Sequence, residues 1–377
     1  MRDFVLTSES VTAGHPDKLC DQISDAMIDA FLSAGVRTPV SAECAIATGI
    51  VFLSVRSRQE APFDPAALAR RVIEEAGYPP GTDQDGPTIM LDLARTASTP
   101  ENPARVAMHM TTAFGHACRH TPTDLAYPIW AAHRLTRELD RARAVGRLPW
   151  LHPDAQAQVA VEFRGRDPYR MTALAITSAS PAAPPREAVA DALLRDVVTP
   201  SFDGCAVAPD ESSRLIFITG PTGGGPAAHS GLTGRKLGDD GYGGFVRQST
   251  SAMSGKSPDR VDRIASYAAR HAARCVVAAG LATECEVQLS YLIGDAGPVT
   301  VEVDTFGSGQ MHDGLISKRL HEVFDFRVGA ILERFSLWEL PRQRQGRFYR
   351  DHATYGHMGR DDLDAPWEDT RDAARLD

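Results

Sequence analysis

A helical period of apolar positions is clearest near the N-terminus, over residues 17–34. Leu19, Ile23 and Met27 recur at every fourth position and would form one apolar stripe, which is typical of an amphipathic helix. Gly35 follows, and glycine is common just past a helix C-terminus. Similar patterns predict further helices at 65–76, 125–145, 186–198, 259–279, 315–324 and 328–334.

Runs of apolar and β-branched residues predict strands between these helices. The run over 40–55 is interrupted by a Thr-Gly pair, which indicates two strands. The runs 159–163 and 171–177 flank a polar turn and predict a hairpin. The stretch 81–103 is rich in Gly, Pro, Asp and Thr, and we expect it to be a mobile loop. The remaining strands are expected at 215–219, 285–293 and 299–303.

The order of these elements predicts an α+β protein with more than one domain. Strands that pack against helices on one side indicate α+β layers rather than an all-β protein or a helix bundle. A chain of 377 residues exceeds the usual size of a single core, and each third carries a similar set of strands and helices. We therefore predict an N-terminal domain at 1–100, a central domain at 101–214 and a C-terminal domain at 215–377.

Composition excludes several classes of protein. The chain is 43% hydrophobic and 24% charged, which excludes wholesale disorder. A formal net charge of -9 argues against a nucleic-acid binder. No apolar run approaches the ~20 residues that span a membrane, and no signal-peptide core is expected at the N-terminus. Six cysteines without a CxxC pair indicate reduced thiols, so we expect a cytoplasmic protein.

The segment 8–18, SESVTAGHPDK, places three candidate chemical residues at the start of the first predicted helix. Backbone N–H groups at a helix N-terminus favour anions, and His15 and Lys18 would add to that preference. Asp17 is a candidate ligand for Mg²⁺ bound to phosphates. The alternative is structural, with Asp17 as a helix cap and His15 filling the turn.

Other acidic residues of the same region are open to two interpretations. Asp21, Asp25 and Asp29 follow Asp17 at every fourth position, which is typical of the solvated flank of an amphipathic helix. Glu43 is a charged residue among apolar neighbours, and such a residue is rarely buried without a partner. A bound cation or simple exposure on one strand face would each account for Glu43, and the period of two favours exposure.

Two further segments combine glycine with cations. The loop 220–226, GPTGGGP, leads into Arg235 and Lys236. A flexible loop with few side chains beside cations fits a polyphosphate cradle, although no Walker A pattern is present. Lys256 and Asp262 offer a further phosphate cation and a further metal ligand. The structural alternatives are an ordinary surface loop and an N-capped helix.

Taken together, these segments resemble the S-adenosylmethionine synthetases (methionine adenosyltransferases). The resemblance covers nearly the whole chain, and its motifs occur in the family's order. They are SESVTAGHPDKLCDQISDAMID at 8–29, GLTGRK at 231–236, DGYGG at 240–244, SGKSPDRVDRIASYAAR at 254–270, VAAGL at 277–281, VDTFG at 303–307 and YGHMGR at 355–360.

The resemblance implies a fold, an assembly and a reaction. The implied fold has three similar βαββαβ-type α+β domains around a pseudo-threefold axis. The implied assembly is a homodimer or a dimer of dimers, with active sites at the subunit interface. In the implied reaction the sulfur of methionine attacks C5′ of ATP, and the triphosphate leaves and is hydrolysed to phosphate and pyrophosphate, assisted by Mg²⁺ and K⁺. Such a displacement needs alignment and stabilisation of charge on the leaving group.

Roles carry over to individual residues through the matching motifs. The resemblance implies that His15 lies beside the triphosphate, that Asp154 binds the ribose, and that cations grip the phosphates. The implied catalytic set is His15, Arg235, Lys236 and Lys256; the nucleotide-binding set is Asp154, Arg235, Lys236, Lys256 and Arg260; and the metal set is Asp17 and Asp262 for Mg²⁺ and Glu43 for K⁺.

The sequence departs from the family's pattern mainly around the acceptor. Arg56, His109 and His229 stand where the pattern has acids, and Gln156 replaces a lysine. An ammonium group is usually met by carboxylates, so these three positions are acceptor-site candidates. The acceptor is methionine by family default, or alternatively a different and anionic acceptor. A non-catalytic regulatory homologue is the other alternative, and the retained metal acids and phosphate cations argue against it.

Overall fold

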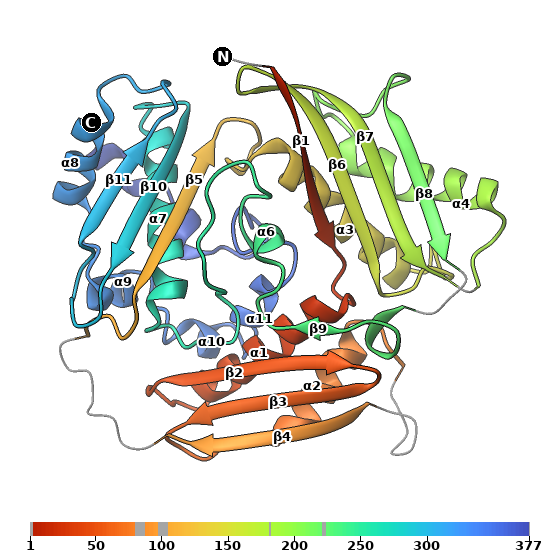
Figure 1. Ribbon diagram of the computed structural model, residues 1–377, viewed down its shortest axis with the longest axis horizontal. Helices are drawn as coiled ribbons and strands as arrows, with labels where there is room; N and C mark the ends of the chain where they lie inside the picture. The colour runs from red at the N-terminus through yellow and green to blue at the C-terminus, as the bar shows by residue number, and fades with distance from the viewer. Residues whose placement is uncertain (1–2, 80–86, 97–104, 181, 221–223, 377) are drawn as a thin grey trace.

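Three β-sheets lie at three corners of the molecule, and helices and loops fill the middle (Figure 1). The computed structural model describes residues 3–79, 87–96, 105–180, 182–220 and 224–376. One sheet has the order β1-β6-β7-β8, a second the order β4-β3-β2-β9, and a third the order β11-β10-β5. The strands are β1 (Phe4–Val11), β2 (Val40–Ala47), β3 (Ile50–Ser57), β4 (Thr88–Arg95), β5 (Thr111–Cys118), β6 (Ala155–Arg164), β7 (Asp167–Ala179), β8 (Arg214–Gly220), β9 (Gly231–Leu232), β10 (Glu284–Tyr291) and β11 (Thr300–Asp304).

A helix of 18 residues packs against each sheet. Helix α1 packs on β2 and β9, α3 on β1 and β6, and α7 on β5 and β10. These long helices are α1 (Pro16–Ser33), α3 (Tyr127–Ala144) and α7 (Val261–Ala278). The shorter helices are α2 (Pro65–Glu75), α4 (Arg186–Leu193), α5 (Thr199–Phe202), α6 (Leu237–Asp240), α8 (Asp313–Val323), α9 (Val328–Arg334), α10 (Leu340–Gln343) and α11 (Tyr349–His352).

The chain repeats one unit three times and exchanges the first strand of each unit. The units run β1-α1-β2-β3-α2-β4, then β5-α3-β6-β7-α4-β8, then β9-α7-β10-β11-α8, with the short α6 between β9 and α7. The first strand pairs with the hairpin of another unit: β1 with β6, β5 with β10, and β9 with β2, each antiparallel. In the first two units the last strand returns parallel to the hairpin.

This cyclic exchange confirms the predicted α+β class with three similar units. It also means that every sheet contains a strand from a neighbouring unit. The boundaries at 1–100, 101–214 and 215–377 therefore stay a prediction.

Most predicted helices and strands are present, with ends shifted by a few residues. The hairpin predicted from 159–163 and 171–177 is formed by β6 and β7. The prediction of a mobile loop over 81–103 is wrong in part, because its central residues form β4, which pairs in parallel with β3. The rest of that predicted loop lies mostly outside the described residues. Strands β1 and β5 were not predicted.

Helix α7 lies very close to strand β5 at Gly115. A Cβ atom added there would lie 2.0 Å from the backbone carbon of Ala269. We expect Gly115→Ala to lower the free energy of unfolding by about 3 kcal/mol, the upper end for overpacking, because the obstacle is backbone. Thermal unfolding measures this effect. Gly220→Ala is the control, since its added Cβ meets nothing within 4 Å, and an equal loss in both variants would contradict the prediction.

All six cysteines are free thiols, and five of them are buried. Among the helices that the structure describes, none is long and apolar enough to cross a membrane.

Candidate active site

The start of helix α1 and the segment after β9 meet at Asp17. One carboxylate oxygen of Asp17, Oδ1, accepts the backbone N–H of Leu232 at 3.0 Å and lies 2.8 Å from Nε of Arg235. Asp17 is buried, whereas Arg235 is partly exposed. The approach requires glycine at position 231, because a Cβ on Gly231 would lie 2.2 Å from the carbonyl oxygen of Pro16. An acid and an arginine more than two hundred residues apart thus form one ion pair.

His15 caps helix α1 beside this ion pair. Its Nδ1 accepts the backbone N–H of Asp17 at 3.2 Å. Burial lowers the pKa of His15, and the nearby carboxylates of Asp154 and Asp17 only partly oppose this. The imidazole is therefore neutral at pH 7. Because Nδ1 accepts, the proton of the neutral ring is on Nε2, which makes that atom a hydrogen-bond donor.

Glu9 of strand β1 contacts both Lys236 of the predicted phosphate site and Gln156 of strand β6. Its Oε1 lies 3.3 Å from Nζ of Lys236, and its Oε2 accepts from Nε2 of Gln156 at 2.9 Å. Gln156, which replaces a lysine of the family pattern, therefore contacts the same carboxylate as Lys236. Nearby, Oδ2 of Asp154 accepts the N–H of Gly225 at 2.8 Å. This bond holds the end of the glycine-rich loop against the start of β6.

A second group of charged residues lies at the start of helix α7. Nζ of Lys256 donates to Oδ2 of Asp262 at 2.8 Å, and Arg260 lies 4.0 Å from the same oxygen. Burial acts to raise the pKa of Asp262, but Lys256 and Arg260 more than offset it, so the pKa is lowered and the group is ionised at neutral pH. Burial and then Arg260 lower the pKa of the neighbouring His109, which is therefore neutral at pH 7.

Glu43 and Arg56 lie together on the exposed outer face of the β2–β3 hairpin. Glu43 stands opposite Ser54 and Arg56 opposite Ser41, so their Cα atoms are diagonal neighbours at ~7–8 Å. Lys256 makes an isolated β-bridge with Ser41, so this face borders the second group. Glu43 is thus exposed on one strand face, as the alternation of apolar and polar positions along the strand predicted.

Comparison with known proteins identifies the family. Family models of the S-adenosylmethionine synthetase N-terminal, central and C-terminal domains match residues 3–96, 105–223 and 223–369. The chain belongs to the S-adenosylmethionine synthetase family. The S-adenosylmethionine synthase of Synechococcus sp. (strain JA-3-3Ab) is 42% identical over 99% of this chain and 97% of its own length. Those of Gloeobacter violaceus and Gloeothece citriformis are 41% and 39% identical over 100% of this chain and 98% and 97% of their own.

The resemblance inferred from the motifs is thereby confirmed, and so is the S-adenosylmethionine synthetase fold. The roles of individual residues stay predictions. Among the described residues, no hydrogen bond or ion pair joins the group at α1 to the group at α7. The first group comprises His15, Asp17, Asp154, Arg235 and Lys236, and the second comprises His109, Lys256, Arg260 and Asp262. Three predicted residues belong to neither group: Glu43 and Arg56 lie on the outer sheet face, and His229 is exposed ahead of β9.

The donor set of this synthetase fits magnesium bound together with a nucleotide. The described residues contain no group of three or more His, Cys, Asp or Glu side chains able to hold a metal ion by themselves. Protein-bound Mg²⁺ commonly uses one or two carboxylates plus substrate phosphates. Asp17 and Asp262 each offer a carboxylate beside a cation that the motifs predict to bind phosphate, which suits that mode of binding.

Two expectations about helix α1 are wrong. Asp21, Asp25 and Asp29 were expected on a solvated flank, but all three side chains are buried, because α1 lies in the middle of the molecule rather than at its surface (Figure 1). Lys18 was expected to attract a bound anion. Its side chain is fully buried and forms ion pairs with Asp21 and Asp240, so it is committed to the protein interior.

Proposed function

We propose that this synthetase transfers the 5′-adenosyl group of ATP to the sulfur of methionine and makes S-adenosylmethionine. The observation that carries the proposal is the Asp17–Arg235 contact at 2.8 Å, which brings a metal-ligand candidate and a phosphate cation from two family motifs into one site. The S–C5′ bond forms, the C5′–O bond breaks, and its electron pair leaves with the triphosphate. Water then cleaves one P–O–P linkage of the bound triphosphate, and phosphate and pyrophosphate are released.

The residues of the site supply charge and alignment rather than a base. The sulfur lone pair of the acceptor is already nucleophilic, so no proton has to be removed. Arg235, Lys236 and Lys256 hold positive charge where the triphosphate accumulates negative charge. Neutral His15 offers its Nε2–H as a donor to a phosphate oxygen, and Asp154 accepts from the ribose.

Two metal ions belong to this proposal. Asp17 and Asp262 would hold Mg²⁺, which neutralises charge on the triphosphate when it is bound. Glu43 would hold K⁺, because it is an exposed carboxylate on the sheet face that borders Lys256.

Mass spectrometry of the products tests the proposed reaction. After incubation with ATP, methionine, Mg²⁺ and K⁺, we expect S-adenosylmethionine with phosphate and pyrophosphate. Conversion of ATP to ADP, or the absence of any adenosylated product across a panel of thioethers and thiols, would contradict the proposal. The absence of product would favour the non-catalytic alternative.

We further propose a homodimer, or a dimer of dimers, with active sites at the subunit interface. The support is the outer face of the sheet formed by β2, β3 and β4, where large apolar side chains are 43% to 53% exposed. Exposed apolar patches of this kind often mark protein interfaces. Glu43 and Arg56 lie on this same sheet face. The exposed apolar residues on this face are Ile50, Phe52 and Met90.

The remaining features of the proposal concern location and other partners. A cytoplasmic location, and the absence of nucleic-acid and membrane partners, stay predictions from composition.

The acceptor-site candidates make a prediction about methionine affinity. Arg56 is exposed on the sheet face that carries Glu43, and a cation there opposes the methionine ammonium. We expect Arg56→Glu to lower the KM for methionine by about 3- to 10-fold, since one nearby charge is worth ~1 kcal/mol or more at intermediate dielectric. Steady-state kinetics with varied methionine measures this change.

Exposed Arg70 on helix α2 provides the matched control, and Arg70→Glu should leave the KM unchanged. A higher KM for methionine in Arg56→Glu would contradict the assignment of Arg56. A wild-type preference for a des-amino thioether acid over methionine would favour the alternative acceptor, to which His109 and His229 would also contribute.

A further inference from the structure

The four aspartates of helix α1 form a buried row in which each side chain holds backbone of another segment. Asp17 accepts the N–H of Leu232, Asp21 that of Gly234, and Asp25 that of Gly255. Asp29 accepts the three N–H groups of residues 348–350. Each of the four aspartates is at most 1% exposed. Three of the four acids therefore bind the segments that carry the proposed phosphate and metal residues.

Asp21 fixes the segment that carries Arg235 and Lys236 from one side. Its Oδ1 accepts the N–H of Gly234 at 2.7 Å, and its Oδ2 lies 3.0 Å from Nζ of Lys18. Gly234 has a φ of +77°, a conformation that only glycine adopts readily. The residue before Arg235 is thus held by both its backbone conformation and its hydrogen bond.

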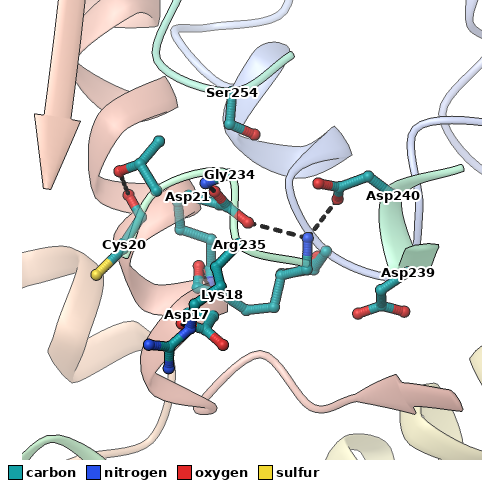
Figure 2. Close-up of polar contacts among 12 residues, drawn as sticks. Asp17, Lys18, Cys20, Asp21, Gly234, Arg235, Asp239, Asp240 and Ser254 are labelled. Atoms are coloured by element: carbon teal, nitrogen blue, oxygen red, sulfur yellow. Dashed lines mark hydrogen bonds and ion pairs between the residues drawn. The ribbon is translucent and has the colours of Figure 1, made fainter. Parts of the chain in front are cut away.

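Lys18 fixes the same segment from the other side. Figure 2 shows its ammonium group between Asp21 and Asp240. Burial acts against the charge of Lys18, but Asp240 and Asp21 more than compensate, so its pKa is raised. Asp240 in turn donates its backbone N–H to the carbonyl of Lys236 at 3.0 Å. Arg235 and Lys236 therefore lie between two anchors that converge on one buried cation.

Asp25 plays the corresponding part for the second group. It accepts the N–H of Gly255 at 2.8 Å and pairs with the fully buried Arg263. Gly255 precedes Lys256, and a Cβ there would lie 2.0 Å from the carbonyl oxygen of Ala42, so the backbone has little room to shift. Arg263 directly follows Asp262. One buried carboxylate thus contacts the neighbours of both Lys256 and Asp262.

We propose that Asp21 and Asp25 are positioning residues, through which helix α1 sets the separation of the Arg235–Lys236 segment from the Lys256–Asp262 group. This proposal rests on the proposed function. Residues four apart on a helix are separated by ~6 Å along its axis, so the spacing of the two carboxylates is rigid. Misplacement of a catalytic group by ~1 Å can cost about 100-fold in rate, which gives such a device a measurable effect.

Double-mutant cycles test the proposal. Asp21→Asn keeps the side-chain volume but replaces an oxygen that faces Lys18 with a donor. We expect it to lower kcat by ~10- to 100-fold, with the KM for ATP changed by less than ~3-fold. In the Arg235→Ala background the same substitution should cost several-fold less than in the wild type, because one of the two cations that it positions is gone. Asp25→Asn should behave in the same way with Lys256→Ala.

Asp29→Asn is the matched control. Asp29 belongs to the same row and is equally buried, but it binds residues 348–350, which carry none of the proposed phosphate or metal residues. Near-ultraviolet circular dichroism gives the folded fraction of each variant, and kcat is divided by that fraction. The effect of Asp29→Asn on this corrected kcat should be the same with and without Arg235→Ala. A purely structural role for Asp21 predicts that same additivity, so equal costs of Asp21→Asn in both backgrounds would overturn the proposal.

Lys18→Met keeps the experiment decisive if Asp21→Asn does not fold. It leaves the Asp21–Gly234 bond in place and removes the ion pairs of Lys18 with Asp21 and Asp240. We expect a kcat loss that is again smaller in the Arg235→Ala background, and an unchanged loss there would overturn the proposal. A wild-type protein that forms no S-adenosylmethionine would overturn the proposed function as well, whereas additive costs in an active protein would overturn the positioning role alone.

Discussion

Asp262→Asn and Asp17→Asn should each lower kcat for S-adenosylmethionine formation by ~1,000-fold or more, with the fold retained. A metal ion at a phosphoryl oxygen supplies several kcal/mol of charge stabilisation, and each 1.36 kcal/mol is worth ~10-fold in rate. Asp262 is held ionised by Lys256 and Arg260 against the effect of burial, which is the state that a metal ligand requires. The asparagine variant keeps the volume and loses the charge.

The measurement is initial rate against Mg²⁺ concentration at saturating ATP and methionine. Asp196→Asn is the control, since Asp196 is a largely buried aspartate that pairs with Arg195 in another part of the molecule, and it should retain wild-type turnover. Wild-type rates for Asp262→Asn at limiting Mg²⁺ would remove Asp262 from the metal set. A loss that excess Mg²⁺ restores would mean that the carboxylate only raises metal affinity.

The buried acids of α1 show where reading of a local pattern fails. A row of aspartates at every fourth position matches a solvated flank, because most helices lie at a surface. Here α1 is covered on that flank by segments from residues 231–234, 255 and 348–350, and nothing in residues 16–33 encodes them. One signal was present, since Ile28 and Leu32 fall on the acidic face at 100° per residue.

The exchange of strands among the three units could not be predicted from the sequence, for a related reason. Strand β5 pairs with β10 from Cys118 opposite Glu284 to Thr111 opposite Tyr291, a partner more than a hundred residues away. Local periodicity identifies a strand, but it carries no information about which strand lies beside it. The site motifs were easier to find because each groups its candidates closely: GLTGRK holds Arg235 and Lys236, and SGKSPDRVD holds Lys256, Arg260 and Asp262.

Arg235→Ala and Lys256→Ala should each lower kcat by about 100- to 1,000-fold while changing the KM for ATP by less than ~3-fold. Charge builds up on the triphosphate as the C5′–O bond breaks, so these cations should bind the transition state better than they bind ATP. In the structure Arg235 faces Asp17, and Lys256 faces Asp262 at 2.8 Å. Each cation is therefore already held beside the carboxylate with which it would share the metal-bound triphosphate.

The two cations should differ in their response to conservative replacement. Arg235 uses two edges of its guanidinium group at once, since Nε faces Asp17 and an Nη atom donates to the carbonyl of Ser230 at 2.7 Å. A lysine has one ammonium group and cannot make both contacts, so Arg235→Lys should recover little of the lost kcat. Lys256 makes a single contact with Asp262, so Lys256→Arg should recover more.

Steady-state kinetics with varied ATP measures kcat and the KM for ATP in each variant, with exposed Lys318→Ala as the control. A rise in KM with kcat unchanged would show that these side chains only dock the nucleotide.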